Sequence, residues 1–336
     1  MSALPARRLG AVGPEVCAIG LGCMGMSGTY GPADDGESIA TIHAALDAGV
    51  ALLDTGDFYG MGHNEMLIRD ALAARRRDEA LISVKFGALR GPDNRFAGND
   101  CSPAAVRNFL GYTLRRLGTD HVDVYRPARV DPDVPIEETV GTIAELVQEG
   151  YVRHVGLSEV SADTLRRAHA VHPICDVQIE YSLLARGPER ELLPACAQLG
   201  VGVTAYGVLS RGLLGGHFSA GAPVSVGDFR AHAPRFTGSN LEHNLDLVER
   251  LRPIAAEGGR NVAQLAIAWV LARDPGIVAL VGARTRARLS DALHVLAEPL
   301  DAGTLAVLDE AFADGIAAGT RYPQAGMAQL DSERRD

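Results

Sequence analysis

The chain has 336 residues and the composition of an ordinary globular protein, with 47% hydrophobic and 22% charged residues. Its formal net charge of -10 argues against nucleic acid as a partner, because phosphate binding requires a basic surface. Five cysteines without CxxC spacing favour a reducing, cytoplasmic location and argue against a disulfide framework or a metal site. No secretory signal and no apolar run of about eighteen residues is visible, so neither export nor a membrane partner is expected.

The first predicted elements are a short hairpin over residues 7–17 and a strand over residues 18–22. Beyond them, apolar runs of strand length alternate with segments of helical periodicity. Seven more strands are predicted, at residues 50–53, 80–85, 121–125, 152–157, 176–181, 201–206 and 277–281. Helices are predicted at residues 38–48, 63–76, 103–117, 136–148, from 161 onward, and at 189–198, 262–271, 286–295 and 304–313. A loop is predicted over residues 88–100, and a long insertion over residues 207–238.

Eight strands alternating with helices predict a parallel sheet covered by helices, and eight is the number that closes a (β/α)8 TIM barrel. We therefore expect an α/β protein with a single barrel domain over residues 1–336 and extra C-terminal helices. Residues 1–17 would form a hairpin that plugs the barrel floor. Residues 315–336 would form a tail, which is polar and expected to be mobile from residue 323 onward. An open doubly wound sheet is the alternative, although no GxGxxG motif follows the first strand.

Three residues near two neighbouring strand ends point to acid–base chemistry. Asp54 follows the buried run that ends at Leu53, Tyr59 lies five residues further on, and Lys85 ends the next predicted strand. A lysine on a buried strand needs a partner, and Asp54 on the adjacent strand is the nearest candidate. A purely structural Asp54–Lys85 ion pair, with Tyr59 as a packed aromatic at the rim, is the alternative.

Further polar residues end other predicted strands, and barrel enzymes place their catalytic groups at these carboxyl ends. They are Ser158, Gln178 and Tyr206. Together with Asp54 and Lys85, they would converge on one rim of the barrel.

The motifs, taken in order, resemble those of the aldo-keto reductases, and most closely the longer bacterial and plant members. The resemblance extends from about residue 7 to residue 295 and rests on Asp54-x5-Tyr59, Val84-Lys85-Phe86-Gly87, Gly156-Leu157-Ser158-Glu159, Val177-Gln178-Ile179-Glu180-Tyr181 and Ala205-Tyr206-Gly207. It implies an oxidoreductase that uses NADPH/NADP+ to reduce an aldehyde or ketone, a sugar or another bulky carbonyl included. Tyr59 would be the general acid, Lys85 would lower its pKa, and Asp54 would keep Lys85 charged.

The resemblance also assigns the cofactor contacts. Ser158, Glu159 and Gln178 would contact the nicotinamide carboxamide, where Glu159 accepts from its NH2 group, and Tyr206 would stack on the nicotinamide ring. The remaining contacts would come from the end of the first strand (Gly22, Cys23, Met24), from a pyrophosphate loop (Gly207, Leu209, Ser210, Arg211, Gly212, Leu213) and from an adenosine-phosphate loop (Gly282, Arg284, Arg286, Arg288, Asp291). The arginines of the last loop favour NADP(H) over NAD(H), and a solvated basic helix face is the alternative.

One position departs from the family pattern. The fourth catalytic residue of the family is a His that closes the fourth strand, and Ala128 stands in its place. Three interpretations remain open: Tyr59 alone suffices in a wider pocket, Arg126 on the same inward face replaces the His, or the chain binds cofactor with little turnover as a regulatory protein or scaffold.

The substrate is the least determined part of the prediction. Candidate wall residues, with Ala128, are Met24, Tyr30, Phe58, Phe96, Arg126 and Arg129. Arg129 also belongs to the usual strand-four pattern of the family, so an ion pair with an acid such as Asp131 is its alternative role. A small-molecule carbonyl compound is the expected partner, and an inward Arg126 would suit an anionic or polyhydroxylated one. A homo-oligomer is compatible with the sequence. The resemblance also implies an alternative for the C-terminal segment, which can close over the pocket in this family.

Overall fold

The computed structural model describes residues 4–216, 218 and 228–334. Eight strands form its centre: β3 (Ile19–Gly22), β4 (Leu52–Gly56), β5 (Leu81–Phe86), β8 (Val122–Pro127), β9 (Val152–Ser158), β10 (Ile174–Glu180), β11 (Gly202–Tyr206) and β12 (Ile277–Val281). They pair in parallel in the order β10-β11-β12-β3-β4-β5-β8-β9, and the two ends of this series join into a closed barrel. The predicted (β/α)8 barrel is confirmed, and the open-sheet alternative is wrong.

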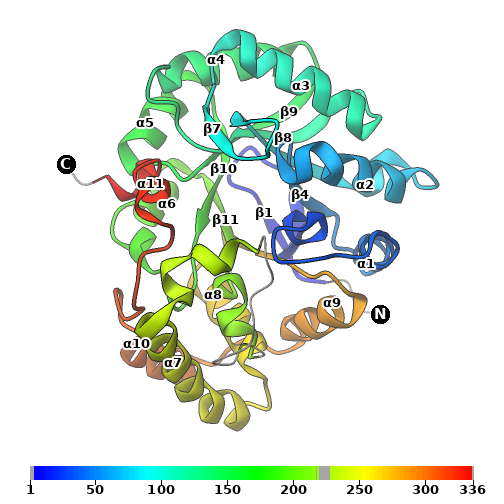
Figure 1. Ribbon diagram of the computed structural model, residues 1–336. Coiled ribbons are helices and arrows are strands. Elements are labelled where there is room, and N and C mark those ends of the chain that lie inside the picture. Colours follow the sequence, from blue (N-terminus) through cyan, green and yellow to red (C-terminus); the bar gives the residue numbers. More distant parts are fainter. Residues whose placement is uncertain (1–3, 217, 219–227, 335–336) are drawn as a thin grey trace.

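Helices surround the barrel (Figure 1). They are α1 (Asp35–Asp47), α2 (His63–Leu72), α3 (Pro103–Leu117), α4 (Ile136–Gln148), α5 (Ala162–Val171), α6 (Leu192–Leu199), α7 (Gly238–Glu257), α8 (Val262–Arg273), α9 (Arg286–Leu293), α10 (Ala302–Ala311) and α11 (Gln324–Met327). Part of the insertion predicted before α7, at residues 217 and 219–227, lies outside the described residues. None of the helices in the described ranges is long and apolar enough to span a membrane.

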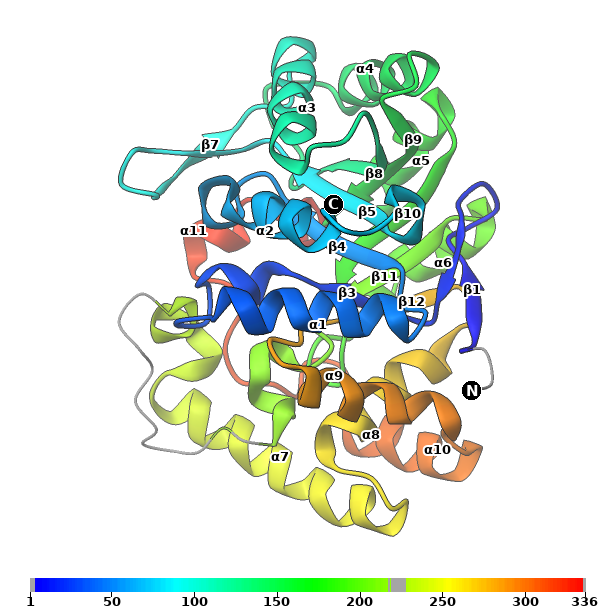
Figure 2. The same cartoon turned by 90° about the vertical axis from the view of Figure 1, so that its right-hand side faces the viewer.

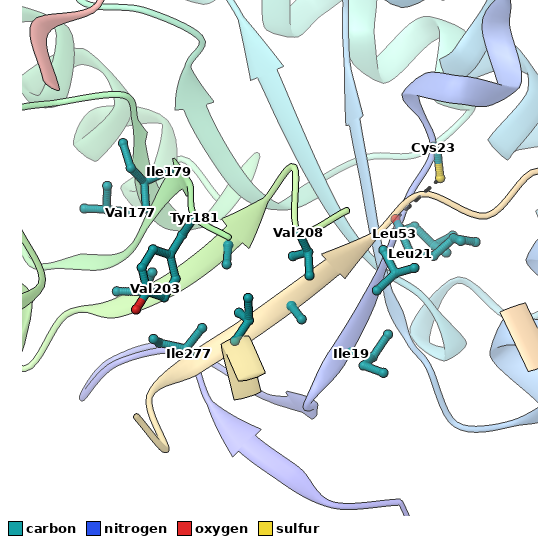
Figure 3. Packing of buried hydrophobic residues seen from close by; sticks show 14 of the residues in the cluster. Ile19, Leu21, Cys23, Leu53, Val177, Ile179, Tyr181, Val203, Val208 and Ile277 are labelled. Atoms are coloured by element: carbon teal, nitrogen blue, oxygen red, sulfur yellow. Dashed lines mark hydrogen bonds between the residues drawn. The ribbon is translucent and has the colours of Figure 1, made fainter. Parts of the chain in front are cut away.

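Side chains on the barrel strands alternate between two environments. Leu53 belongs to the large hydrophobic cluster, several members of which Figure 3 shows along β3, β10, β11 and β12. Its neighbour Leu52 belongs to a separate small cluster that includes Val278 and Leu280 of β12. Because successive strand residues point to opposite faces, Asp54 shares the face of Leu52, inside the barrel.

The N-terminal hairpin closes one end of the barrel, as predicted. Strands β1 (Ala6–Arg8) and β2 (Glu15–Cys17) pair antiparallel, and Leu9 and Val16 join the small interior cluster. A Cβ atom on Gly202 of β11 would come within 2.6 Å of the Gly10 backbone nitrogen, so the hairpin turn presses directly on the barrel. Figure 2 shows this hairpin at one end of the barrel and the hairpin β6–β7 toward the opposite end.

The loop predicted over residues 88–100 is instead an antiparallel hairpin of β6 (Ala88–Arg90) and β7 (Phe96–Asn99). The turn residues were correctly recognised, since the Gly91 amide donates to the Arg95 carbonyl and Asn94 has a φ of 62°. Strands of three and four residues are too short to show an alternating pattern in the sequence.

The described residues 323–334, expected to be mobile or to close over the pocket, are packed against the barrel. Helix α11 and the segment after it lie against the barrel, where Leu330 is 1% exposed. The Ser332 amide donates to the Glu159 carbonyl at 3.1 Å, and the Asp331 carboxylate accepts from the Ser161 amide at 2.8 Å. The tail is therefore fixed to the loop that follows β9.

Candidate active site

A buried lysine and aspartate lie side by side at the carboxyl ends of β4 and β5. Register pairs Asp54 with Ser83 and Gly56 with Lys85, and the Lys85 ammonium group contacts Asp54 Oδ1. The other oxygen, Asp54 Oδ2, accepts from the Ser83 hydroxyl at 3.0 Å and from the Gln178 side-chain amide at 2.7 Å. The contact expected between Asp54 and Lys85 is therefore present. Gln178, expected at the cofactor carboxamide, uses its side-chain NH2 group on Asp54, which leaves its side-chain carbonyl for another partner.

Tyr59 follows β4 in a short 3-10 turn, Tyr59–Gly62, and its side chain is half-buried. The Lys85 nitrogen lies 5.3 Å from the centroid of the Tyr59 ring. Both residues are described, and no hydrogen bond joins the ammonium group to the phenol. Burial, followed by the charge of Asp54, raises the pKa of Tyr59 above its usual value. The direction is opposite to the lowering expected from the sequence.

Burial also lowers the pKa of Lys85, because desolvation disfavours the charged ammonium form. The neighbouring Asp54 carboxylate opposes this shift, while the positive charge of Arg126 adds to it. Asp54 is thus the group that favours the charged form of Lys85.

Arg126 points into the barrel, as predicted, but its guanidinium group is occupied. It is 1% exposed, forms an ion pair with Asp176 of β10 at 3.0 Å and donates to the Ser83 hydroxyl at 3.0 Å. The hydroxyl of Thr204 on β11 also contacts Asp176. Arg126 therefore belongs to a polar layer inside the barrel, and its guanidinium group is not available to a substrate.

Ala128 directly follows β8 and is 2% exposed. Its amide donates to the Phe86 carbonyl at 2.8 Å, which ties the end of β8 to β5. The methyl side chain offers no hydrogen-bonding group at this position.

Glu159 has a different environment from the one expected. Its carboxylate is fully buried and accepts from the Tyr206 hydroxyl at 2.7 Å, from Arg321 and from the Ser332 hydroxyl. The Glu180 amide donates to it as well, at 3.1 Å. With its oxygens engaged in this way, Glu159 is not available to the cofactor carboxamide. Ser158, which precedes it, is buried at the end of β9 beside Gln178.

The C-terminal segment contributes residues that the sequence analysis missed. Arg321 pairs with Glu159 at 2.8 Å, with Glu180 at 3.2 Å and with Glu333 at 2.7 Å. Tyr322 places its ring 4.5 Å from the guanidinium carbon of Arg211. A signal was present in the sequence, since glutamates predicted at buried strand ends require cationic partners.

A directed series of hydrogen bonds crosses this rim. Arg129 donates to the Tyr322 hydroxyl at 3.3 Å, the Tyr322 and Tyr206 hydroxyls lie 3.0 Å apart, and Tyr206 donates to Glu159. Arginine can only donate and a carboxylate can only accept, so the hydroxyl protons all point from Arg129 toward Glu159. The half-buried Tyr206 ring is held in place by both neighbours.

The loop after β11 has a strongly curved backbone. Gly207, Ser210, Arg211 and Gly212 have positive φ angles of 65°, 45°, 55° and 102°. The curve contains Leu209 and the buried Leu213, which anchors it on the core. Arg211 is held by Glu180 at 2.8 Å, so its charge is already balanced by the protein.

The loop after β12 and the first turn of α9 carry excess positive charge. Burial, followed by the charges of Arg288 and Arg230, lowers the pKa of Arg284, while Asp228 opposes these effects. Arg284 donates to the carbonyls of Tyr30 and Pro32 at 3.2 and 3.1 Å, and Arg288 is exposed. Because the positive charges of these arginines repel one another, the arginines would bind a phosphate group favourably.

Two of the expected phosphate-loop residues have protein partners instead. Arg286 pairs with Glu37 at 2.9 Å, and Asp291 accepts from the side-chain amides of Asn261 and Gln264 at 3.0 and 2.9 Å. Asp291 therefore holds α9 against the start of α8.

Two glycines whose backbone is not covered by other side chains adjoin this loop. Gly22 and Gly282 follow the paired residues Leu21 and Val281, and a Cβ atom on either glycine would meet no atom closer than 3.8 Å. Cys23, next to Gly22, is fully buried and faces the core. The open backbone at two strand ends, with the nearby arginines, fits an anionic dinucleotide cofactor.

The predicted pocket walls are only partly brought together. Tyr30 and Tyr322 are both near enough to Tyr59 to contribute to the rise of its pKa, and Phe58 packs edge-on against Tyr59 with centroids 4.9 Å apart. Met24 begins the short 3-10 turn Met24–Ser27 after β3. Phe96 is 40% exposed on β7 and does not line a buried wall.

Comparisons with known proteins agree with this geometry. The model of the aldo/keto reductase family matches residues 18–313. The probable aldo-keto reductase 1 of Glycine max is 41% identical over 318 residues, which cover 94% of this chain and 91% of that protein.

Solved structures are similar over nearly the full length. The glycerol dehydrogenase of Gluconobacter oxydans superimposes with a TM-score of 0.83 at 27% identity, covering 100% of this chain and 98% of that one. The holo form of an aldo-keto reductase from Bacillus halodurans gives a TM-score of 0.75 at 27% identity, covering 96% and 99%. This chain belongs to the aldo/keto reductase family of NAD(P)-dependent, carbonyl-reducing oxidoreductases.

Proposed function

We propose that this chain uses NADPH to reduce an aldehyde or ketone, such as a sugar or another bulky carbonyl compound, with Tyr59 as the general acid. The observation that supports this most directly is the buried Lys85–Asp54 pair at the rim, with the Lys85 nitrogen 5.3 Å from the Tyr59 ring. A buried ion pair beside a phenol at the carboxyl end of a barrel strand suits proton transfer better than a purely structural role.

The raised pKa of Tyr59 fits the role of a proton donor. A free phenol titrates near ~10, and burial raises this value further, so Tyr59 keeps its proton at neutral pH. When negative charge develops on the carbonyl oxygen, Tyr59 transfers its proton there. The nearby ammonium group of Lys85 stabilises the phenolate that remains, and Asp54 keeps that ammonium group charged.

A nicotinamide cofactor, when bound, would supply the hydride for the carbonyl carbon. Tyr206 would support the nicotinamide ring, with Ser158 and the side-chain carbonyl of Gln178 as candidates for the carboxamide. The phosphates would lie along Gly22, Gly282 and the curved loop from Gly207 to Leu213. Arg284 and Arg288 would bind the 2′-phosphate, which is the basis for preferring NADPH over NADH.

The test is NADPH consumption with a panel of aldehydes and ketones. Tyr59→Phe removes only the acidic hydroxyl, and we expect it to lower kcat about 100- to 10,000-fold. Tyr112→Phe is the matched control, because Tyr112 is 59% exposed on α3. Equal activity of Tyr59→Phe and Tyr112→Phe would exclude the proposed role of Tyr59.

Ala128 favours a second candidate function, in which the chain binds NADP(H) as a regulatory or scaffold protein with little turnover. An alanine at this position cannot polarise a carbonyl group. This function predicts no activity across the panel and NADPH-dependent thermal stabilisation that survives Tyr59→Phe. Turnover that depends on the Tyr59 hydroxyl would exclude it.

A further inference from the structure

Four arginines lie around the C-terminal segment, and three of them contact carboxylates. Arg211, Arg235 and Arg321 share Glu180, and Arg321 also pairs with Glu159 and Glu333. A fourth arginine of this rim, Arg129, has no carboxylate within ion-pair distance among residues 4–216, 218 and 228–334.

Arg129 nevertheless lies at the same rim. It follows Ala128 at the end of β8, is half-buried, and has its guanidinium carbon 5.6 Å from the centroid of the Tyr322 ring. Burial lowers its pKa, but Tyr322, Tyr206 and Glu159 outweigh this effect and raise the pKa overall. Arg129 is therefore a permanent, partly desolvated cation.

The hydrogen-bonding capacity of Arg129 is largely unused by the described protein atoms. A guanidinium group has five N–H donors. In Arg129, one nitrogen donates to the Ala128 carbonyl at 2.6 Å and another to the Tyr322 hydroxyl at 3.3 Å. Partly buried cations are normally paired, so a ligand anion is a natural partner for the remaining donors.

The 2′-phosphate of the cofactor is not a suitable candidate for that anion. In the closed barrel, β8 lies four strands from β12 in either direction, so the ends of these two strands are opposite one another. The arginines proposed for the 2′-phosphate follow β12. Arg129 lies on the other side of the barrel mouth, where Tyr322 connects it to Tyr206.

We propose that Arg129 binds a carboxylate group of the substrate and that the preferred substrates are carbonyl compounds that carry a carboxylate. This inference rests on the proposed function, since it assumes that a carbonyl compound is reduced beside Tyr59. The carboxylate is held as a hydrogen-bonded ion pair and stays chemically unchanged. Arg129 thereby orients the substrate at the rim where the family pattern places an imidazole and this chain has Ala128.

The test compares each acid with its own methyl ester, which removes the charge and keeps the aldehyde. The substrates are para-carboxybenzaldehyde and succinic semialdehyde, each with its ester, at saturating NADPH. We expect the native enzyme to favour the acid in kcat/KM for at least one pair. Arg129→Met should lower kcat/KM for that acid about 30-fold or more, mainly through KM, since a buried charge partner is lost. The ester should lose much less, because for it only the effect of the Arg129 charge on the pKa of Tyr59 is removed.

Two further variants make the test selective. Arg129→Lys keeps the charge without the planar fork, and it should retain part of the preference for the acid. Arg95→Met is the matched control, because Arg95 has a side chain that is 87% exposed on the loop between β6 and β7. It should leave both substrates unchanged.

The outcomes separate this inference from the proposed function. Turnover of the esters without a preference for either acid in the native enzyme overturns the role of Arg129 and leaves the proposed function intact. An equal loss for acid and ester in Arg129→Met also overturns it. Absence of turnover for every aldehyde tested refutes the proposed function, and the inference with it.

Discussion

Arg321→Met tests whether the C-terminal segment is held by buried charge. The variant keeps most of the side-chain volume and removes the guanidinium group that contacts Glu159, Glu180 and Glu333. The side chains of Glu159 and Glu180 are 0% exposed, so neither carboxylate can recover its hydration without movement of the segment.

The size of the loss in stability depends on which partners each carboxylate keeps in the variant. Glu180 keeps Arg211 at 2.8 Å, whereas Glu159 keeps only hydrogen bonds from the neutral groups of Tyr206, Ser332 and the Glu180 backbone. Breaking a buried pair from one side costs about 3–5 kcal/mol. Because one of the two carboxylates stays paired, we expect Arg321→Met to lower the free energy of unfolding by about 3 kcal/mol.

The loss should depend on pH with a definite sign. Burial alone would raise the pKa of Glu159, but Arg321, and after it Arg129, hold that pKa below its usual value. The stabilisation from Glu159 is therefore present above its unfolded pKa, near ~4.3, and is lost as the pH falls toward the folded value. Without Arg321, the pKa of Glu159 rises. At mildly acidic pH, Glu159 of the variant then becomes protonated, which removes the cost of its unpaired buried charge. The difference in the free energy of unfolding between variant and native protein should therefore be smaller at pH 4.5 than at pH 7.

Urea unfolding monitored by fluorescence provides the measurement, because Trp269 is the only tryptophan and is fully buried. Arg334→Met is the control in the same segment. Arg334 is 59% exposed and lies 3.8 Å from Asp331, so its loss should cost less than about 1 kcal/mol. A loss in Arg321→Met no larger than in Arg334→Met, or a loss that is equal at both pH values, would refute the reasoning.

Three further predictions concern Asp54, Ala128 and Asp57. Asp54→Asn removes the carboxylate that opposes the lowering of the Lys85 pKa, so Lys85 should lose its proton at a lower pH in the variant. In a kcat–pH profile, the decline in activity with rising pH should therefore begin at a lower pH than in the native enzyme. Ala128→His should raise kcat for small neutral aldehydes about tenfold, and an unchanged kcat would show that this position does not control turnover. Burial, and after it Glu65, raises the pKa of Asp57 to about 8, so its ionisation opposes folding as the pH rises toward that value. Asp57→Asn should therefore raise the melting temperature more at pH 9 than at pH 5, which thermal melts at both pH values can check.

Local patterns predicted the features that repeat along the chain. Alternating apolar runs identified the strands of the barrel, and α4 (Ile136–Gln148) was predicted with its observed boundaries because Ile136 begins a clear amphipathic period. The Asp54–Lys85 contact was predictable too, since a lysine on a buried strand requires an acid on a neighbouring strand.

Contacts between distant parts of the chain were not predictable from such patterns. Nothing near Gln178 in the sequence indicates that its amide binds Asp54, on a strand more than a hundred residues earlier. The partner of Glu159 lies in the C-terminal segment at Arg321, which has the polar composition of a mobile tail. The sequence also could not distinguish Arg126 from Arg129, since only the fold shows that Asp176 meets Arg126 inside the barrel.

The first and last segments that the structure describes contact opposite ends of the barrel, and this has a practical consequence for handling the enzyme. The N-terminal hairpin sits on the floor, where Arg7 donates to the carbonyls of Leu271 and Asp274, whereas Asp331 and Ser332 lie against the loop beside Tyr206. An affinity tag at the N-terminus leaves the mouth of the barrel clear. A tag or fusion partner at the C-terminus is attached close to the residues that border the pocket. Kinetic constants are therefore best measured on protein tagged at the N-terminus.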